Sequence, residues 1–131
     1  MTQEDKELLL KDLCARLPYG VIVQGNEKYI SEIDSIEKKC GIIYLINVDK
    51  SLLIDQIKPY LRPMSSMTEE ERGQYMDFIE WSHNDYDGTT TTCINKERLY
   101  EYLNFIYSHH FDYRGLIEKG LALEAPEGMY N

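Results

Sequence analysis

Histidine and aspartate side chains are the residues of this sequence best suited to chemistry, and they fall in two short groups. The catalytic candidates are His83, Asp85, His110 and Asp112, and the candidate metal ligands are His83, Asp85, Asp87, His109 and His110. Imidazole and carboxylate groups bind zinc or manganese and also act as general acids and bases. One hypothesis for the function is therefore a small metal-dependent enzyme that uses this His/Asp cluster.

The spacing of these residues argues against that hypothesis. No HExxH motif is present, and His109 and His110 are adjacent on an expected helix, so their side chains point about 100° apart. The stretch 85–88 resembles part of a calcium loop, but it places His83 and Ile94 where that loop requires Asp and Glu. Phosphate-binding glycine loops and a GxSxG elbow are also missing from the sequence. We therefore expect no metal and no cofactor.

The size and charge of the chain define its general class. A chain of 131 residues with 43% hydrophobic and 28% charged residues predicts one compact globular domain, 1–131. The net charge of −9 opposes binding to phosphate backbones, so we expect no direct nucleic-acid binding. No apolar run approaches the length of a membrane span. Cys14, Cys40 and Cys93 lack CxxC spacing, which indicates reduced, buried thiols in a cytoplasmic protein.

The N-terminal half predicts one helix followed by a β-rich part. Leucines at helical spacing favour a helix within 1–17, which Pro18 and Gly20 end. The β-rich part, 20–63, contains short strands, and the apolar run 41–48 predicts a central strand covered on both faces. The stretch 27–39 fits either a strand or a helix, and we favour the strand. Together these elements predict an α+β fold with a small antiparallel sheet or an SH3-like barrel.

The segment KPYLRPMSSMTEEE, residues 58–71, predicts the junction between the sheet and a helical part, 68–120. Its two prolines favour extended backbone, and Thr68 with Glu71 matches a capping box that begins a helix at 69–82. A second amphipathic helix begins after Asn95. A short third helix is expected at 113–119, followed by a tail, 121–131. Ser65 and Ser66 have no structural role in this interpretation and stay open as phosphorylation or binding residues.

The two amphipathic helices share an internal similarity. Residues 75–88 align without gaps to residues 102–115, and seven of the fourteen positions are identical. The similarity fits a duplicated functional site using His83, Asp85, His110 and Asp112, but we favour the interpretation of two helices that end alike, each with His in its last turn and Gly after it.

Tyrosine is unusually frequent, with eleven residues, and it is enriched in protein interfaces. The core face of the second helix is expected at Leu99, Tyr102, Leu103 and Ile106. Tyr100, Phe105 and Tyr107 make the remaining faces apolar as well, so we predict an interaction surface there.

Two segments resemble a known group of proteins. KPYLRPMSSMTEEE and the C-terminal HHFDYRGLIEKGLALEAPEGMY, residues 109–130, are similar to segments shared by small uncharacterised proteins from gut bacterial genomes and their phages. The resemblance implies a bacterial or phage setting and identifies no site. We therefore predict a non-enzymatic protein-interaction or accessory module, acting with a protein partner or as a homo-oligomer. The metal-dependent enzyme is the alternative.

Overall fold

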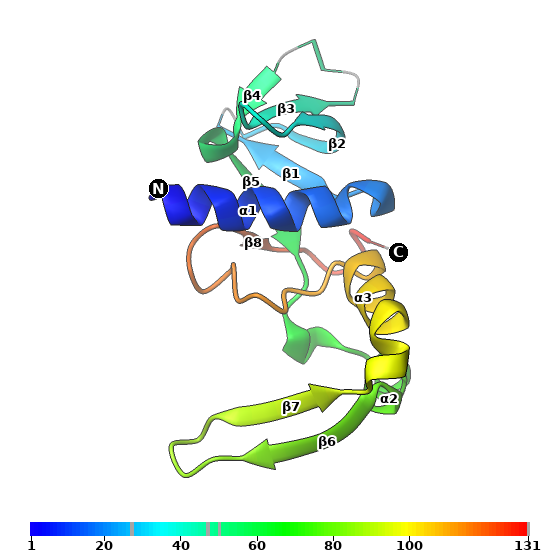
Figure 1. The fold of residues 1–131 in the computed structure, drawn as a ribbon. Coiled ribbons are helices and arrows are strands. Elements are labelled where there is room, and N and C mark those ends of the chain that lie inside the picture. Colours follow the sequence, from blue (N-terminus) through cyan, green and yellow to red (C-terminus); the bar gives the residue numbers. More distant parts are fainter. Residues whose placement is uncertain (27, 47, 50, 131) are drawn as a thin grey trace.

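The computed structural model describes residues 1–26, 28–46, 48–49 and 51–130, and it has a mixed α+β fold (Figure 1). In chain order the elements are α1 (Gln3–Arg16), η1 (Leu17–Tyr19), β1 (Ile22–Gly25), β2 (Ile30–Glu37), β3 (Ile42–Leu45), β4 (Ser51–Leu53), η2 (Ile54–Gln56), β5 (Ile57–Leu61), η3 (Met64–Ser66), α2 (Glu69–Asp77), β6 (Ile79–Asn84), β7 (Thr90–Ile94), η4 (Lys96–Arg98), α3 (Leu99–Ser108) and β8 (Leu123–Glu124), where η marks a 3₁₀ helix. Glu27, Asn47, Lys50 and Asn131 fall within predicted segments but lie outside the described residues.

The N-terminal helix forms as predicted and covers the larger sheet. Thr2 and Asp5 form a capping box at its start. Leu9 and Leu13 are fully buried in the main hydrophobic core, which α1 shares with the sheet. After the helix, Gly20 adopts a left-handed conformation with φ 75°, which lets the chain turn into β1.

The larger sheet has six strands in the order β4-β3-β2-β1-β5-β8, and every pairing is antiparallel except that of β5 with β8. The predicted antiparallel sheet is therefore confirmed. Closure into an SH3-like barrel is not found among the described residues, because β4 and β8 end the order without pairing to each other. The two-residue strand β8 lies beside β5 at the edge where a barrel would have to close.

The β-rich part differs from the predictions in the position and burial of one strand and in the exposure of Cys40. The stretch 27–39 contains the favoured strand, β2, but the predicted central strand is β3, which lies second from the edge. Burial alternates along β3, so it is covered on one face only and Tyr44 is exposed on the other. Pro59 lies inside β5, where β8 pairs only with the next two residues and leaves an open edge at the proline. None of the three cysteines is fully buried as predicted: Cys40 is exposed in the turn after β2, and Cys14 and Cys93 are partly buried.

The junction at 58–71 forms as predicted. The Thr68 hydroxyl accepts from the Glu71 amide at 3.1 Å, and the Glu71 carboxylate accepts from the Thr68 amide at 2.9 Å. The capping box at the start of α2 is therefore confirmed. Ser66 donates its hydroxyl to the carbonyl of Pro63 at 2.7 Å, which gives this serine a structural contact.

The second half of the predicted helix 69–82 is a strand. α2 ends at Asp77, and β6 then pairs with β7 in a two-stranded antiparallel sheet. The turn between them is closed by two hydrogen bonds, from the Asp85 amide to the Thr89 carbonyl and from the Gly88 amide to the Asp85 carbonyl. Gly88 has φ 85°, as hairpins of this kind require. The 75–88 and 102–115 segments therefore differ in structure, so the interpretation of two helices that end alike is wrong.

The remaining C-terminal elements also differ in part from the predicted ones. Asn95 caps the following turn through the Glu97 amide, and Ile106 is buried on the core face of α3, whereas Leu99 is exposed. The predicted helix 113–119 is not formed. Gly115 and Gly120 both have left-handed φ values, and this segment consists of turns.

The chain leaves the large sheet and returns to it at adjacent points. The Arg62 amide donates to the His110 carbonyl, and the Asp112 amide donates to the Arg62 carbonyl, each at 2.8 Å. Residues 63–111, here called the helical unit, form a second hydrophobic cluster around Phe78, Phe105, Ile106 and Phe111. The β6–β7 hairpin of this unit projects away from the sheet (Figure 1). None of the described helices has the length and apolar character needed to cross a membrane.

Candidate functional site

The first group of predicted site residues lies on the hairpin. His83 is in β6, and its Nε2 is 3.4 Å from Oδ1 of Asp85, with both side chains largely exposed. Asp87 is at the tip and accepts a hydrogen bond from the Thr89 amide at 3.0 Å. Hydrogen bonding with Thr89 lowers the pKa of Asp87. These three groups form an exposed polar cluster on the hairpin.

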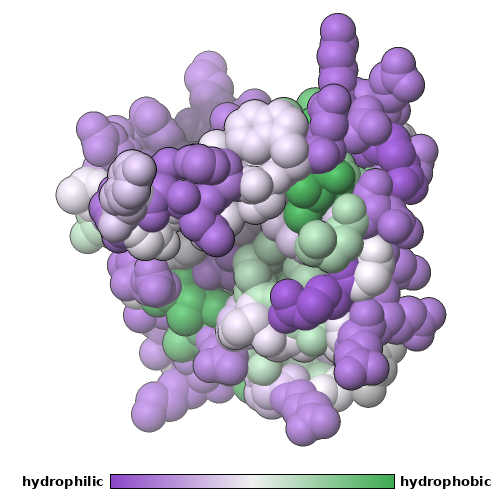
Figure 2. Space-filling model, turned by 90° about the horizontal axis from the view of Figure 1, so that it is seen from below, coloured by the Kyte–Doolittle hydropathy of each residue, from purple (hydrophilic) through white to green (hydrophobic). Residues whose placement is uncertain are grey.

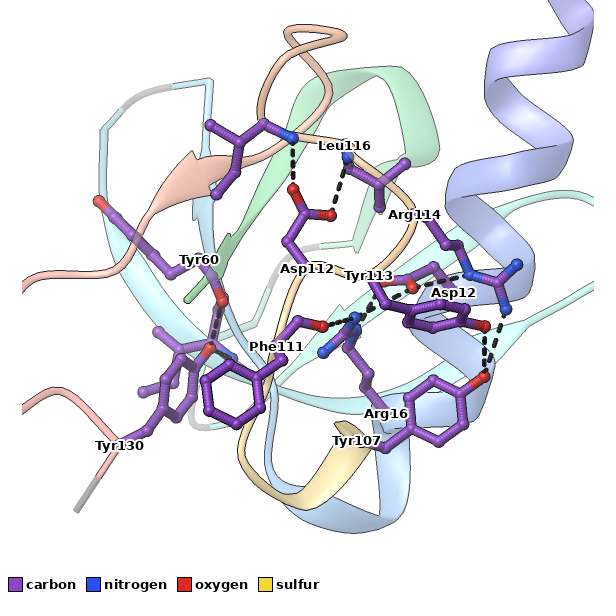
Figure 3. A network of polar contacts seen from close by, with 12 residues as sticks. Asp12, Arg16, Tyr60, Tyr107, Phe111, Asp112, Tyr113, Arg114, Leu116 and Tyr130 are labelled. Atoms are coloured by element: carbon purple, nitrogen blue, oxygen red, sulfur yellow. Dashed lines mark hydrogen bonds and ion pairs between the residues drawn. The ribbon is translucent and has the colours of Figure 1, made fainter. Parts of the chain in front are cut away.

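The second group lies at the end of α3, where each residue has a structural contact. His109 Nδ1 donates to the Phe105 carbonyl at 2.8 Å, and His110 Nε2 donates to a backbone carbonyl of η1 at 3.0 Å. The Asp112 carboxylate accepts from the amides of Leu116 and Ile117, at 2.8 and 3.0 Å (Figure 3). Asp112 therefore caps the turn that follows it.

The two groups do not meet. Across residues 1–26, 28–46, 48–49 and 51–130, no group of three or more His, Cys, Asp or Glu side chains is arranged to hold a metal ion. His110 is buried, whereas His83 is exposed on a separate element. The six residues therefore do not build a common active site.

A buried ionic network joins α1 to the end of the helical unit (Figure 3). Asp12 accepts from Arg16 Nε at 2.7 Å and from Arg114 Nε at 3.0 Å. Arg16 Nη2 also donates to the Phe111 carbonyl at 2.6 Å. Asp12 and Arg16 are both fully buried. Because buried charges are costly unless they are paired, this network fixes α1 against the loop after α3.

Sequence reasoning missed this network, although a signal was present. Asp12 and Arg16 occupy the same helical stripe as Leu9 and Leu13, which are core residues. A charged pair four residues apart on a core stripe indicates a buried ion pair. Burial raises the pKa of Tyr113, whose hydroxyl lies 2.9 Å from that of a second tyrosine, Tyr107, beside the network.

A cleft of about 490 Å³ lies between the start of α2, the end of α3 and the C-terminal tail. Arg62 donates two hydrogen bonds to the Glu71 carboxylate, at 2.7 and 2.8 Å, and its guanidinium lies over the Phe111 ring. The hydrogen bonds from Arg62 lower the pKa of Glu71 to about 2. His109 lies 3.7 Å from the same carboxylate. The charges at the base of this cleft are thus already engaged with one another.

The hairpin offers the most exposed ordered surface of the described chain. Every residue from 81 to 91 is exposed, including Trp81 at 52% and Tyr86, which is fully exposed. Seen from the side of the hairpin, the surface is mainly hydrophilic, with apolar residues gathered in small areas around a hollow (Figure 2). The projecting hairpin, residues 79–94, is therefore the strongest candidate for recognition.

The interaction surface predicted on α3 is only partly available. Tyr100 is 78% exposed, but Phe105 is buried in the second cluster. Tyr107 is partly buried, and its hydroxyl lies within hydrogen-bond distance of another tyrosine. Sequence reasoning missed the hairpin because it assigned β6 to a helix. The run of four threonines, 89–92, was the signal that could have found β7.

Comparisons of this chain with models of protein families, with curated proteins and with solved structures found no significant match to any of them.

Proposed function

We propose that this chain is a non-enzymatic protein-interaction module of a bacterium or phage, and that the projecting hairpin is its binding element. One observation carries the proposal: eleven consecutive residues, 81–91, are ordered in a hairpin yet exposed on every side. A two-stranded hairpin that buries neither face gains little stability by itself in water. A partner that covers it supplies the missing burial.

The side chains on the hairpin support this proposal. Trp81 and Tyr86 are large, amphipathic residues of the kind enriched at binding hot spots. Burying an aromatic side chain of this size removes about 150–250 Å² from water, which makes each a strong anchor for a partner. Neither the Trp81 ring nor the Tyr86 ring belongs to either of the two hydrophobic clusters.

The cellular setting is part of the same proposal. The resemblance of residues 58–71 and 109–130 to small proteins of gut bacteria and phages supports a bacterial or phage origin. The three cysteines are free thiols, which fits the cytoplasm. A metal-dependent enzyme has less support, because its candidate ligands lie on two separate elements.

Site-specific crosslinking tests the proposal. A photoreactive benzoylphenylalanine replaces Tyr86 at the hairpin tip, and a matched control replaces Tyr44, an exposed tyrosine on the far sheet. After irradiation of cells that naturally make the chain, position 86 should give a discrete adduct that position 44 does not give. The adduct should disappear when Trp81→Ser is added. An identical set of adducts from both positions, or none from position 86, would contradict the proposal.

A further inference from the structure

We infer that the partner presents an extended, basic segment, which adds as a third strand to the free edge of β7. This inference rests on the proposed function, because it specifies how the projecting hairpin binds. It follows from three features of the hairpin: the direction of its backbone groups, the difference between its two edges, and its charge.

The register of the hairpin identifies the outward-facing backbone groups. The Asp85 amide donates to the Thr89 carbonyl at 2.7 Å, so the residue pair next to the turn is hydrogen-bonded. In an antiparallel pair, hydrogen-bonded and non-hydrogen-bonded pairs alternate along the strands. The pairs His83–Thr91 and Trp81–Cys93 are therefore hydrogen-bonded, and the pairs Ser82–Thr92 and Asn84–Thr90 are not.

Residues of the non-hydrogen-bonded pairs direct their amides and carbonyls away from the hairpin. On β6 these residues are Ser82 and Asn84, and on β7 they are Thr90 and Thr92. Among the described residues, no further strand pairs with either edge. Each edge thus presents a short row of backbone donors and acceptors, the arrangement that an added strand recognises.

The two edges are protected differently. β6 carries an irregularity between Ile79 and Trp81, together with the charged or titratable residues Glu80 and His83. Such features discourage strand addition. β7, Thr90–Ile94, has a continuous register, contains no charged residue and no proline, and is rich in β-branched threonine. The edge of β7 is therefore the one open to a partner strand.

The charge of the hairpin selects the chemistry of the added strand. Residues 79–94 include Glu80, Asp85 and Asp87 but neither Lys nor Arg. A hairpin that carries three carboxylates and no Lys or Arg attracts a strand rich in Lys or Arg and repels an acidic one. A second copy of this chain is a poor occupant for the same reason, because each copy carries a net charge of −9.

Amide hydrogen exchange with a defined probe tests this inference. The probe is the acetylated, amidated peptide KTVTKTVTK, and the control peptide is ETVTETVTE. With the full chain and saturating probe, exchange of the Thr90 and Thr92 amides should slow by about tenfold, because an added strand accepts their hydrogen bonds. The outward amides of Ser82 and Asn84 should keep their free exchange rates. The acidic control peptide should protect neither pair, and added salt should weaken binding of the basic probe.

A matched pair of proline variants separates the two edges. Thr92→Pro removes an outward amide of β7 without removing a bond between β6 and β7, and Ser82→Pro does the same on β6. Affinity for KTVTKTVTK should fall at least about tenfold in Thr92→Pro and stay near the wild-type value in Ser82→Pro. Cross-strand nuclear Overhauser contacts between His83 and Thr91 verify that each variant keeps its hairpin.

Every other result overturns the inference. Protection of Ser82 and Asn84 would place the strand on β6, and equal binding of the acidic peptide would refute basic recognition. Concentration-dependent dimers that protect Thr92 without peptide would identify a second copy as the occupant. Absence of peptide binding together with a specific adduct from position 86 would reject the added strand while the proposed function stands. Absence of both peptide binding and the adduct from position 86 would reject the added strand and the proposed function together.

Discussion

Acidification is expected to destabilise the protein through His110, an imidazole that is only 1% exposed. Its Nε2 donates to the Tyr19 carbonyl, and its ring stacks on the Tyr130 ring with 3.9 Å between centroids. Burial lowers the pKa of His110 to about 4, and the positive charges of Arg16 and Arg62 act in the same direction, whereas the hydrogen bond to the carbonyl opposes them.

The direction of the pH effect on stability follows from the pKa of His110 in the folded and in the unfolded state. The pKa of His110 is about 4 in the folded protein and close to 6.5 in the unfolded chain, so the unfolded chain takes up the proton first as the pH falls. The stabilisation from neutral His110 is complete above pH 6.5 and is lost progressively between pH 6.5 and pH 4. A difference of about 2.5 pKa units at about 1.4 kcal/mol each corresponds to about 3 kcal/mol.

Urea denaturation at several pH values between 7 and 4 measures this effect, with far-ultraviolet circular dichroism as the signal. The wild type is compared with His110→Gln, and the free energy of unfolding of the wild type should fall by about 3 kcal/mol more than that of the variant over this range. His83→Gln is the matched control, because that imidazole is largely exposed, and it should keep the wild-type pH dependence.

Carboxylates that titrate in this range affect the wild type and His110→Gln alike, so they cancel in the comparison. Equal losses of unfolding free energy in these two proteins would refute the reasoning. A nuclear magnetic resonance titration midpoint for His110 at or above 6.5 would refute it independently.

Three further substitutions test the contacts that hold the fold, each by urea denaturation at pH 7. Tyr130→Phe should cost about 2 kcal/mol, because the tyrosine hydroxyl accepts from the backbone amide of Ile22 at 2.8 Å and the variant leaves that amide without this acceptor. Thr68→Ala should cost about 1 kcal/mol through loss of the helix cap. Arg16→Met should cost about 4 kcal/mol, because it removes one partner of the buried Asp12 carboxylate.

Exposed residues of the same types provide the controls. Tyr86→Phe, Thr89→Ala and Arg72→Met should each change the free energy of unfolding by less than about 0.5 kcal/mol, because all three side chains are exposed. If Tyr130→Phe behaves like Tyr86→Phe, the hydroxyl contributes nothing to tail docking. If Thr68→Ala is neutral, the cap is not stabilising, and if Arg16→Met is neutral, the ion pair can be replaced by apolar packing.

Local sequence signals identified the elements whose structure is decided locally. The capping box at Thr68 and the leucine stripe of α1 each specify a helix within one or two turns, and both are found. β6 was misassigned because Met76, Ile79 and His83 have helical spacing. The chain instead turns at Gly88, and the β-branched threonines that follow pair with β6. Pairing with a later segment therefore overrode the local pattern.

The contacts between distant segments could not be predicted from a single sequence. Asp12 meets Arg114 although 102 residues separate them, and Tyr130 reaches Ile22 across 108 residues. Nothing local at either end of these pairs specifies the partner. For the candidate site, residue types were informative, but their convergence depends on topology, which separates His83 from His110.

The adjacency of Arg62 and Asp112, where the helical unit leaves and rejoins the sheet, has an evolutionary consequence. An insertion whose ends meet at one point can change in length and sequence while the host structure keeps its strand order. The tip of the hairpin lies far from the junction at Arg62 and Asp112, so mutations at the tip leave the hydrogen bonds of that junction unchanged. Such an architecture would let the sequence of the hairpin tip change while the larger sheet keeps its contacts.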